Sequence, residues 1–287
     1  MVRWINKMGR QISNPLVSIC VITYNSCKYI LETLESVKKQ TYSNIELIVS
    51  DDGSIDDTIL VVKEWIENNK QRFKNTKVIT VKKNTGVTGN CNRAYKSASG
   101  IYIKDIADDT LEPTYIEECV NFFSQNSECK VLFTKMNYFY SEEIFDFKQP
   151  LIDETFFSLS AENQLENIKK NNLPQYPTPA VIYNRSVFED IGFFDERIPM
   201  WEDGPFYFKL AQNKIKVYLL DKKLVNYRLL SGSLSNSFSV TMKKSVALFY
   251  IYYKFKQDFE YKPIKALLKY IKYFFGYYVL YKLKVFK

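Results

Sequence analysis

Three of the adjacent acidic pairs in this chain of 287 residues, which contains no histidine, follow or precede predicted strands and helices at positions that could do chemistry. The pairs are Asp51 with Asp52, Asp108 with Asp109, and Glu202 with Asp203. Without an imidazole, a general base that works near neutral pH has to be a carboxylate, a lysine, a cysteine or a tyrosine. Ser/His/Asp catalysis and histidine-ligated zinc are excluded. The carboxylates are therefore the first candidates for chemistry.

The first pair opens the segment Asp-Asp-Gly-Ser at 51–54, which admits two interpretations. Asp, Gly and Ser form turns, and Ser54 with Asp57 resembles a helix capping box. The segment also follows an apolar strand directly, and the strand before it ends in Thr-Tyr-Asn at 23–25. A carboxylate in that position can accept the imide N–H of uracil. The two segments together favour nucleotide binding.

The second pair, Asp108 and Asp109, either caps the helix that begins near Pro113 or binds a cation. Two adjacent carboxylates at a strand end repel each other unless a cation neutralises them. One or two carboxylates plus substrate phosphates are the usual ligands of protein-bound Mg²⁺ or Mn²⁺. We favour the metal, which would stabilise negative charge developing on a diphosphate leaving group.

The third pair, Glu202 and Asp203, precedes a glycine and an apolar helix pattern. As a purely structural feature, the acids would favour the positive end of that helix. As a chemical feature, a carboxylate here would remove a proton from an acceptor hydroxyl that attacks the anomeric carbon of a sugar. We expect Asp203 to be that base.

The elements that must position these acids alternate along residues 16–110. The pattern predicts strands at 16–25, 45–51, 77–81 and 101–106, separated by helices near 28–39, 59–68 and 90–97. Alternation of this kind predicts an α/β fold with a parallel sheet, in which ligands lie outside the carboxyl ends of the strands. Segment 23–25 and the first two acidic pairs should therefore converge at one edge.

Four segments resemble family 2 glycosyltransferases with the GT-A fold. They are VSICVITYN, QTYSNIELIVSDDGSIDDT, NTGVTGNCNRAYKSASGIYIKDIADD and GFFDERIPMWEDGPFYFKL, and the resemblance extends over about residues 16–235. It implies a Rossmann-like, mainly parallel central sheet flanked by helices. It also implies an inverting transfer, dependent on Mn²⁺ or Mg²⁺, from a nucleotide sugar to a hydroxyl of a glycan or lipid-linked saccharide. The donor in this family is most often a UDP-sugar.

The resemblance assigns roles by position. The expected nucleotide-sugar-binding residues are Thr23, Tyr24, Asn25, Asp52, Asn84, Asp108 and Arg228. The expected metal ligand is Asp109, the expected catalytic base is Asp203, and Trp201 with Glu202 are expected on the acceptor side.

Two positions depart from the family pattern. Ala107 stands where the common DxD motif has an acid, and Leu230 stands where a histidine follows the arginine by two positions. These departures keep open a catalytically silent nucleotide-sugar-binding protein. A sugar-nucleotide pyrophosphorylase is a further alternative, although the Gly-rich N-terminal phosphate loop of such enzymes is missing. A QxxRW signature of processive synthases is also missing, so we expect one sugar to be added per encounter.

The basic charge of the chain is concentrated at its C-terminal end. Residues 243–287 hold eleven lysines against two acids, a net +9, while the whole chain carries +8. Four of these lysines fall within an arc of about 80° on a helix predicted from Tyr261, with apolar residues on the other side. They are Lys262, Lys265, Lys269 and Lys272. The pattern favours an anionic membrane surface over nucleic acid, with packing on the body or on another subunit as the alternatives.

We therefore divide the chain into an N-terminal extension at 1–15, a glycosyltransferase domain at 16–240 and a basic aromatic helical tail at 241–287. Within the domain, 16–110 should bind the nucleotide and 111–240 the acceptor. The longest apolar runs fall short of the roughly 20 residues that span a bilayer. We expect a cytoplasmic, peripheral protein on the inner face of the plasma membrane, in lipopolysaccharide or capsule assembly. Its five cysteines, without a CxxC pair, should be free thiols.

Overall fold

Two strands buried along their whole length form the interior of the parallel half of the sheet. They are β1 (Val17–Thr23) and β2 (Ile45–Asp51), which pair in parallel. Strand β3 (Asn75–Thr80) pairs with β2 and β4 (Tyr102–Ile106) pairs with β1, both also in parallel. Mostly apolar runs are typical of parallel strands that are covered on both faces, and β1 and β2 follow this pattern. The computed structural model describes residues 14–141, 144, 153–169, 178–230 and 240–276.

The other half of the eight-stranded sheet is mixed, and the strand order is β3-β2-β1-β4-β7-β6-β8-β5. Strand β7 (Val181–Asn184) runs antiparallel to both β4 and β6 (Val131–Tyr140). Strand β8 (Val217–Leu229) is parallel to β6, and the short β5 (Thr110–Leu111) is antiparallel to β8. The predicted α/β architecture with a mainly parallel sheet is therefore confirmed.

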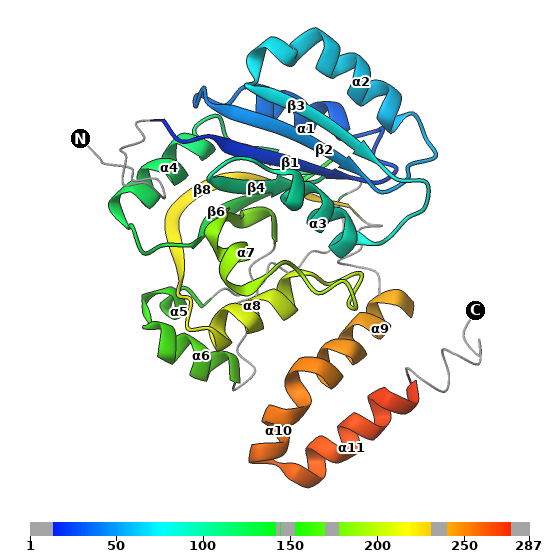
Figure 1. Ribbon diagram of the computed structural model, residues 1–287, viewed down its shortest axis with the longest axis vertical. Helices are drawn as coiled ribbons and strands as arrows, with labels where there is room; N and C mark the ends of the chain where they lie inside the picture. Colours follow the sequence, from blue (N-terminus) through cyan, green and yellow to red (C-terminus); the bar gives the residue numbers. More distant parts are fainter. Residues whose placement is uncertain (1–13, 142–143, 145–152, 170–177, 231–239, 277–287) are drawn as a thin grey trace.

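Helices cover both faces of this sheet (Figure 1). The chain passes from β1 to β2 to β3 in one direction across the sheet, so right-handed crossovers place α1 and α2 on the same face. It then returns in the opposite direction to β4, which places α3 on the other face. The helices of the body are α1 (Ile30–Lys38), α2 (Thr58–Asn69), α3 (Val87–Ser97), α4 (Tyr115–Gln125), α5 (Thr155–Ser158), α6 (Ala161–Lys169), α7 (Ser186–Ile191) and α8 (Asp203–Gln212), with 3₁₀ turns η1 (Lys70–Arg72) and η2 (Thr178–Ala180). The five cysteines are free, as predicted.

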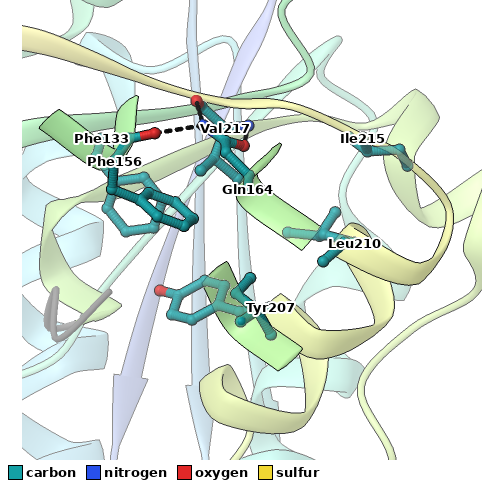
Figure 2. A pocket seen from close by; sticks show the side chains of 9 residues that line it. Phe133, Phe156, Gln164, Tyr207, Leu210, Ile215 and Val217 are labelled. Atoms are coloured by element: carbon teal, nitrogen blue, oxygen red, sulfur yellow. Dashed lines mark hydrogen bonds between the residues drawn. The ribbon is translucent and has the colours of Figure 1, made fainter. Parts of the chain in front are cut away.

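A buried glutamine fixes α6 to the start of β8. The side-chain amide of Gln164 donates to the carbonyls of Phe156 (3.1 Å) and Val217 (3.0 Å), and its oxygen accepts the N–H of Val217 at 3.0 Å. Figure 2 shows these bonds beside a cavity of about 10 Å³ that Tyr207 of α8 also lines. A cavity of that size holds about one water molecule, so it is a feature of core packing.

The predicted helical tail is present. Helix α9 (Val240–Phe249) continues through a π-helical segment, η3 (Tyr250–Lys254), into α10 (Phe255–Tyr261), and α11 (Pro263–Phe274) returns alongside. Figure 1 shows this hairpin projecting from the body beside α8. Proline begins α11 because the first helical position needs no N–H donor. Across the described ranges, every helix is too short or too polar to cross a bilayer.

Candidate active site

The turn after β2 is shaped by Asp51 and tied to the end of β1. The carboxylate of Asp51 accepts the backbone N–H groups of Gly53 (3.0 Å) and Ser54 (3.1 Å) as well as the Ser54 hydroxyl. Gly53 has a φ of 83°, which glycine adopts without strain. Asn25 donates its N–H to Ser54 Oγ at 2.8 Å and accepts the N–H of Ile55 at 2.9 Å. The turn interpretation is therefore correct for Asp51.

Asp52 holds the loop that precedes α3. Its Oδ1 accepts the Thr85 hydroxyl (2.7 Å) and Nη2 of Arg93 (2.6 Å), and its Oδ2 accepts the N–H groups of Thr85 (2.9 Å) and Gly86 (2.8 Å). A carboxylate offers about four lone-pair sites, and these four bonds use them. Direct binding of the nucleobase by Asp52 stays a prediction, and it would require one of these bonds to open.

The other predicted residues of this edge lie beside that loop. Thr23 ends β1 with a buried hydroxyl that has no partner in the described part of the chain. Its carbonyl accepts the Asp52 N–H at 3.0 Å. The ring of Tyr24 is 45% exposed next to it. Asn84 is exposed, and its side chain accepts the N–H of Gly86 at 3.0 Å. A partly open polar edge thus forms at the carboxyl ends of β1 and β2, as predicted.

A close backbone contact joins this edge to the third acidic pair. Gly86 has a φ of 89°, and a Cβ on it would lie 2.5 Å from the carbonyl oxygen of Pro199. Thr88, in the first turn of α3, donates its N–H to Pro199 O (3.1 Å) and its hydroxyl to Ile198 O (2.6 Å). The chain reaches Glu202 a few residues later. The loop before α3 therefore fixes the segment that leads to Glu202 and Asp203.

Arg228, near the end of β8, connects the second acidic pair to the same edge. Its backbone N–H donates to Asp109 Oδ1 (2.8 Å), its Nε donates to the Asp108 carbonyl (2.7 Å), and its Nη2 pairs with Glu32 at 2.5 Å. The guanidinium is buried between two aromatic rings whose centroids lie 4.9 and 4.7 Å away. The rings belong to Tyr29 and Phe139. This arrangement places a fixed positive charge beside both carboxylates.

The environment of the second pair fits a divalent cation. Burial raises the pKa of Asp109 to about 7, with the Arg228 N–H opposing the shift and the charge of Asp108 adding to it. Burial also raises the pKa of the more exposed Asp108, against the Ser26 hydroxyl and Arg228. A cation would relieve both shifts, and oxygen donors suit Mg²⁺ and Mn²⁺. The described residues contain no group of three or more acidic, Cys or His ligands, so other ligands would come from substrate phosphates and water.

The third pair lies at the N-terminus of α8 and shares one hydroxyl. Thr178 Oγ1 is 3.2 Å from Glu202 Oε1 and 3.1 Å from Asp203 Oδ2. The N–H of Gly204 donates to Asp203 Oδ1 at 2.6 Å. Burial and then the Asp203 charge raise the pKa of Glu202 to about 8, and burial raises that of Asp203. Because the helix N-terminus favours the charged form of Asp203, Glu202 holds the proton of the pair near neutral pH.

Trp201 connects this pair to the C-terminal helices. A Cβ on Gly204 would lie 2.5 Å from the Trp201 indole, so a glycine is required for the ring to pack against the first turn of α8. The indole also packs edge-on against Phe249 of α9, with 4.9 Å between ring centroids. The predicted acceptor-side tryptophan thus lies between the acids and the tail.

Sequence reasoning missed the residues that hold the predicted ones in place. Thr178 and Arg93 contact acids that are distant along the chain, and no motif or spacing marks either contact. The sequence places Gly86 in a predicted loop, but it does not indicate that Gly86 contacts Pro199.

Comparison with known proteins identifies relatives of this chain. Residues 18–192 match the family model described as glycosyl transferase family 2. The chain is 31% identical over 239 residues to the Escherichia coli UDP-Glc:alpha-D-GlcNAc-diphosphoundecaprenol beta-1,3-glucosyltransferase WfaP, across 81% of this chain and 85% of WfaP. It is 35% identical over 122 residues to an Escherichia coli chondroitin synthase, across 42% of this chain and 17% of that protein's length.

Among solved structures, Staphylococcus aureus TarS 1-349 in complex with UDP-GlcNAc superposes with a TM-score of 0.62. The two chains are 22% identical, and the superposition covers 94% of this chain and 76% of TarS 1-349. At this identity the likeness establishes the fold, which is the one predicted from the sequence.

Proposed function

The chain belongs to glycosyl transferase family 2, and we propose that it transfers one sugar, with inversion, from a UDP-sugar to a hydroxyl of a lipid-linked saccharide. The observation that carries this proposal is the carboxylate pair at the start of α8, fixed through Pro199 to the donor-side loop. The relative WfaP, which aligns over most of both chains, supports the substrate classes, because its name specifies a UDP-sugar donor and a diphosphoundecaprenol-linked acceptor. The biological role would be surface polysaccharide assembly.

The donor would lie at the carboxyl edge of β1, β2 and β4. Tyr24 offers an exposed ring for stacking on the base, and Asn25 and Asn84 offer amide groups near the ribose. Arg228 would face the diphosphate, and its position between two aromatic rings leaves it little freedom to move away. Asp109, with Asp108 beside it, would hold Mn²⁺ or Mg²⁺. The bound cation would supply charge stabilisation to the leaving diphosphate.

The acceptor hydroxyl would approach from the side of α8. Asp203 would accept its proton while the hydroxyl oxygen attacks the anomeric carbon and the bond from that carbon to the diphosphate breaks, releasing UDP. Attack opposite the leaving group inverts the anomeric centre. Glu202, protonated beside Asp203, would donate a hydrogen bond to the acceptor without adding a second negative charge. Trp201 would pack against the acceptor sugar.

The tail would hold the enzyme at the inner face of the plasma membrane. Helix α11 exposes an apolar stripe on the side that faces away from Ala266, which is its buried contact with the tail. The stripe consists of Ile264, Leu267, Leu268, Ile271 and Phe275. Exposed lysines flank it, which suits an anionic lipid surface. Lys269 departs from the predicted lysine face, because its ammonium lies 4.3 Å from the Tyr250 ring centroid, toward the rest of the tail.

The test is sugar transfer by the wild type and by Asp203→Asn, with a panel of UDP-sugars, Mn²⁺ and a GlcNAc-diphosphate-lipid acceptor. We expect the variant to lose about 10²–10⁴-fold in kcat while its thermal shift with UDP is unchanged. Asp190→Asn, on the surface in a pair with Lys130, is the control and should retain full activity. Equal turnover by Asp203→Asn would remove Asp203 as the base. Donor binding without turnover by the wild type would favour the silent binder.

A further inference from the structure

A cavity of about 170 Å³ lies between the C-terminal helices and the body. Its walls come from α6, α8, α9, η3 and α11 together with the segment before α8. The lining residues are Ile168, Trp201, Phe208, Val246, Phe249, Tyr250, Lys254, Lys269 and Tyr273. Engineered apolar cavities of about 150 Å³ admit a benzene molecule. This cavity is therefore large enough for one compact apolar group, unlike the small one in Figure 2.

Two lysines interrupt the otherwise apolar and aromatic lining. Lys254 is buried, and its ammonium donates to Asp258 Oδ1 (2.7 Å) and to the Lys169 carbonyl (3.0 Å). Lys269 is 44% exposed, lies over the Tyr250 ring and is 4.0 Å from Asp258. Two ammonium groups around one carboxylate leave a net positive charge at this wall. Because its side chain is partly exposed, the Lys269 ammonium can bind an anion.

The position of the cavity connects it to the acceptor-side acids. Trp201 lines it and directly precedes Glu202 in the chain. At the other end it is bounded by α11, whose outward face carries the exposed apolar stripe defined above. Because Trp201 adjoins both the cavity and Asp203, a molecule with a polar end near Asp203 can place an apolar end in the cavity. Figure 1 shows α9 and α11 on the side of the body where α8 lies.

We propose that this cavity binds the first isoprenoid unit of a lipid-diphosphate acceptor, with the Lys269 ammonium facing a phosphate of that acceptor. The assignment rests on the proposed function. The lining favours a prenyl group over a second sugar because it offers few free hydrogen-bonding groups. The Tyr250 hydroxyl, for example, already donates to the Ala266 carbonyl at 3.3 Å. The net positive charge matches a phosphate. An enzyme with this site binds the lipid end of its acceptor as well as the sugar end.

Binding is measured first without turnover, by calorimetry with geranyl diphosphate. Val246→Trp fills the cavity with an indole ring and should weaken binding by about tenfold or more, because the prenyl group then no longer fits. Lys269→Gln should weaken it by about tenfold, the value of one charge-assisted hydrogen bond. Lys265→Gln is the matched control, since it removes the same charge from an exposed position of α11 outside the cavity lining. It should bind as the wild type does.

Turnover then separates this site from the reaction itself. Val246→Trp and Lys269→Gln should raise KM for a GlcNAc-diphosphate-geranyl acceptor by about tenfold and leave KM for the methyl glycoside of GlcNAc and for the donor unchanged. Wild-type protein that fails to bind geranyl diphosphate, or variants that change both acceptors equally, would overturn the cavity assignment. Binding of geranyl diphosphate without transfer to either acceptor would support the cavity and contradict the proposed function. Circular dichroism of each variant confirms that it is folded.

Discussion

Replacing Glu202 by Gln should make the protein more stable at alkaline pH than the wild type. The ordinary pKa of a glutamate is 4.5, and in the folded chain that of Glu202 is raised to about 8, by burial first and by the charge of Asp203 second. Between these values the unfolded chain has released a proton that the folded chain still holds. The unfolded state therefore binds fewer protons, and stability falls as pH rises through this window. Glutamine does not titrate and escapes this loss.

The size of the effect follows from the width of the window. One pKa unit corresponds to about 1.36 kcal/mol, so a rise from about pH 5 to about pH 8 would cost a fully buried glutamate about 4 kcal/mol. Glu202 is partly exposed, and solvent screening reduces this to about 2 kcal/mol.

The assay is urea unfolding of both proteins at about pH 5, 6.5 and 8 and constant ionic strength. The unfolding free energy of Glu202→Gln relative to the wild type should rise by about 2 kcal/mol across the series, which corresponds to a relative gain in Tm of about 4–8 °C. Glu162→Gln, at an exposed position of α6, should follow the wild type at every pH. If Glu202→Gln also loses stability in parallel with the wild type, then Glu202 does not retain its proton and the charge assignment of the pair is wrong.

Three further substitutions test the supports of the site. Asp52→Asn breaks the ion pair with Arg93 and at least one hydrogen bond to the loop before α3. It should therefore lower the free energy of unfolding in urea by about 2–4 kcal/mol and raise KM for the donor. An unchanged KM would show that this loop does not contribute to donor binding. Gly86→Ala should lower stability by about 2 kcal/mol or more in the same assay and lower kcat, whereas Gly276→Ala, with open space around it, should do neither. Arg228→Lys keeps the charge but loses the planar stacking, so KM for the donor should rise about tenfold in steady-state kinetics; an unchanged KM would remove the diphosphate contact.

The parallel half of the fold could be predicted because each of its strands is a short apolar run between helical patterns. β1 and β2 are buried at every position, and most of their residues are apolar, although Ser18 and Glu46 are buried among them. Strand β8 was not predicted as a strand. Its centre carries Asp221, Lys222 and Lys223, which are exposed, and its pairing with β6 shifts register there. A bulged strand loses the regular alternation from which strands are recognised.

The candidate site was predictable in its residue types and less so in its contacts. The first two acidic pairs stand at strand ends, and topology alone brings strand ends to one edge. Arg228 was identified only through the family resemblance, because its position depends on the register of β8. The engagement of all four lone-pair sites of Asp52 could not be foreseen, since its partners lie more than 30 residues away.

The backbone contact between Gly86 and Pro199 connects the proposed donor and acceptor sides of the site. Asp52 fixes Gly86 through a buried hydrogen bond, and Gly86 packs against Pro199 with no room for a Cβ, so a shift of one segment changes the packing of the other. The next residues along the chain are Trp201 and the acids of α8. A donor that orders the loop after β3 therefore also orders the segment that carries the proposed base. Alignment of the acceptor would in this way depend on a bound donor, which favours transfer to the acceptor over hydrolysis of the donor by water.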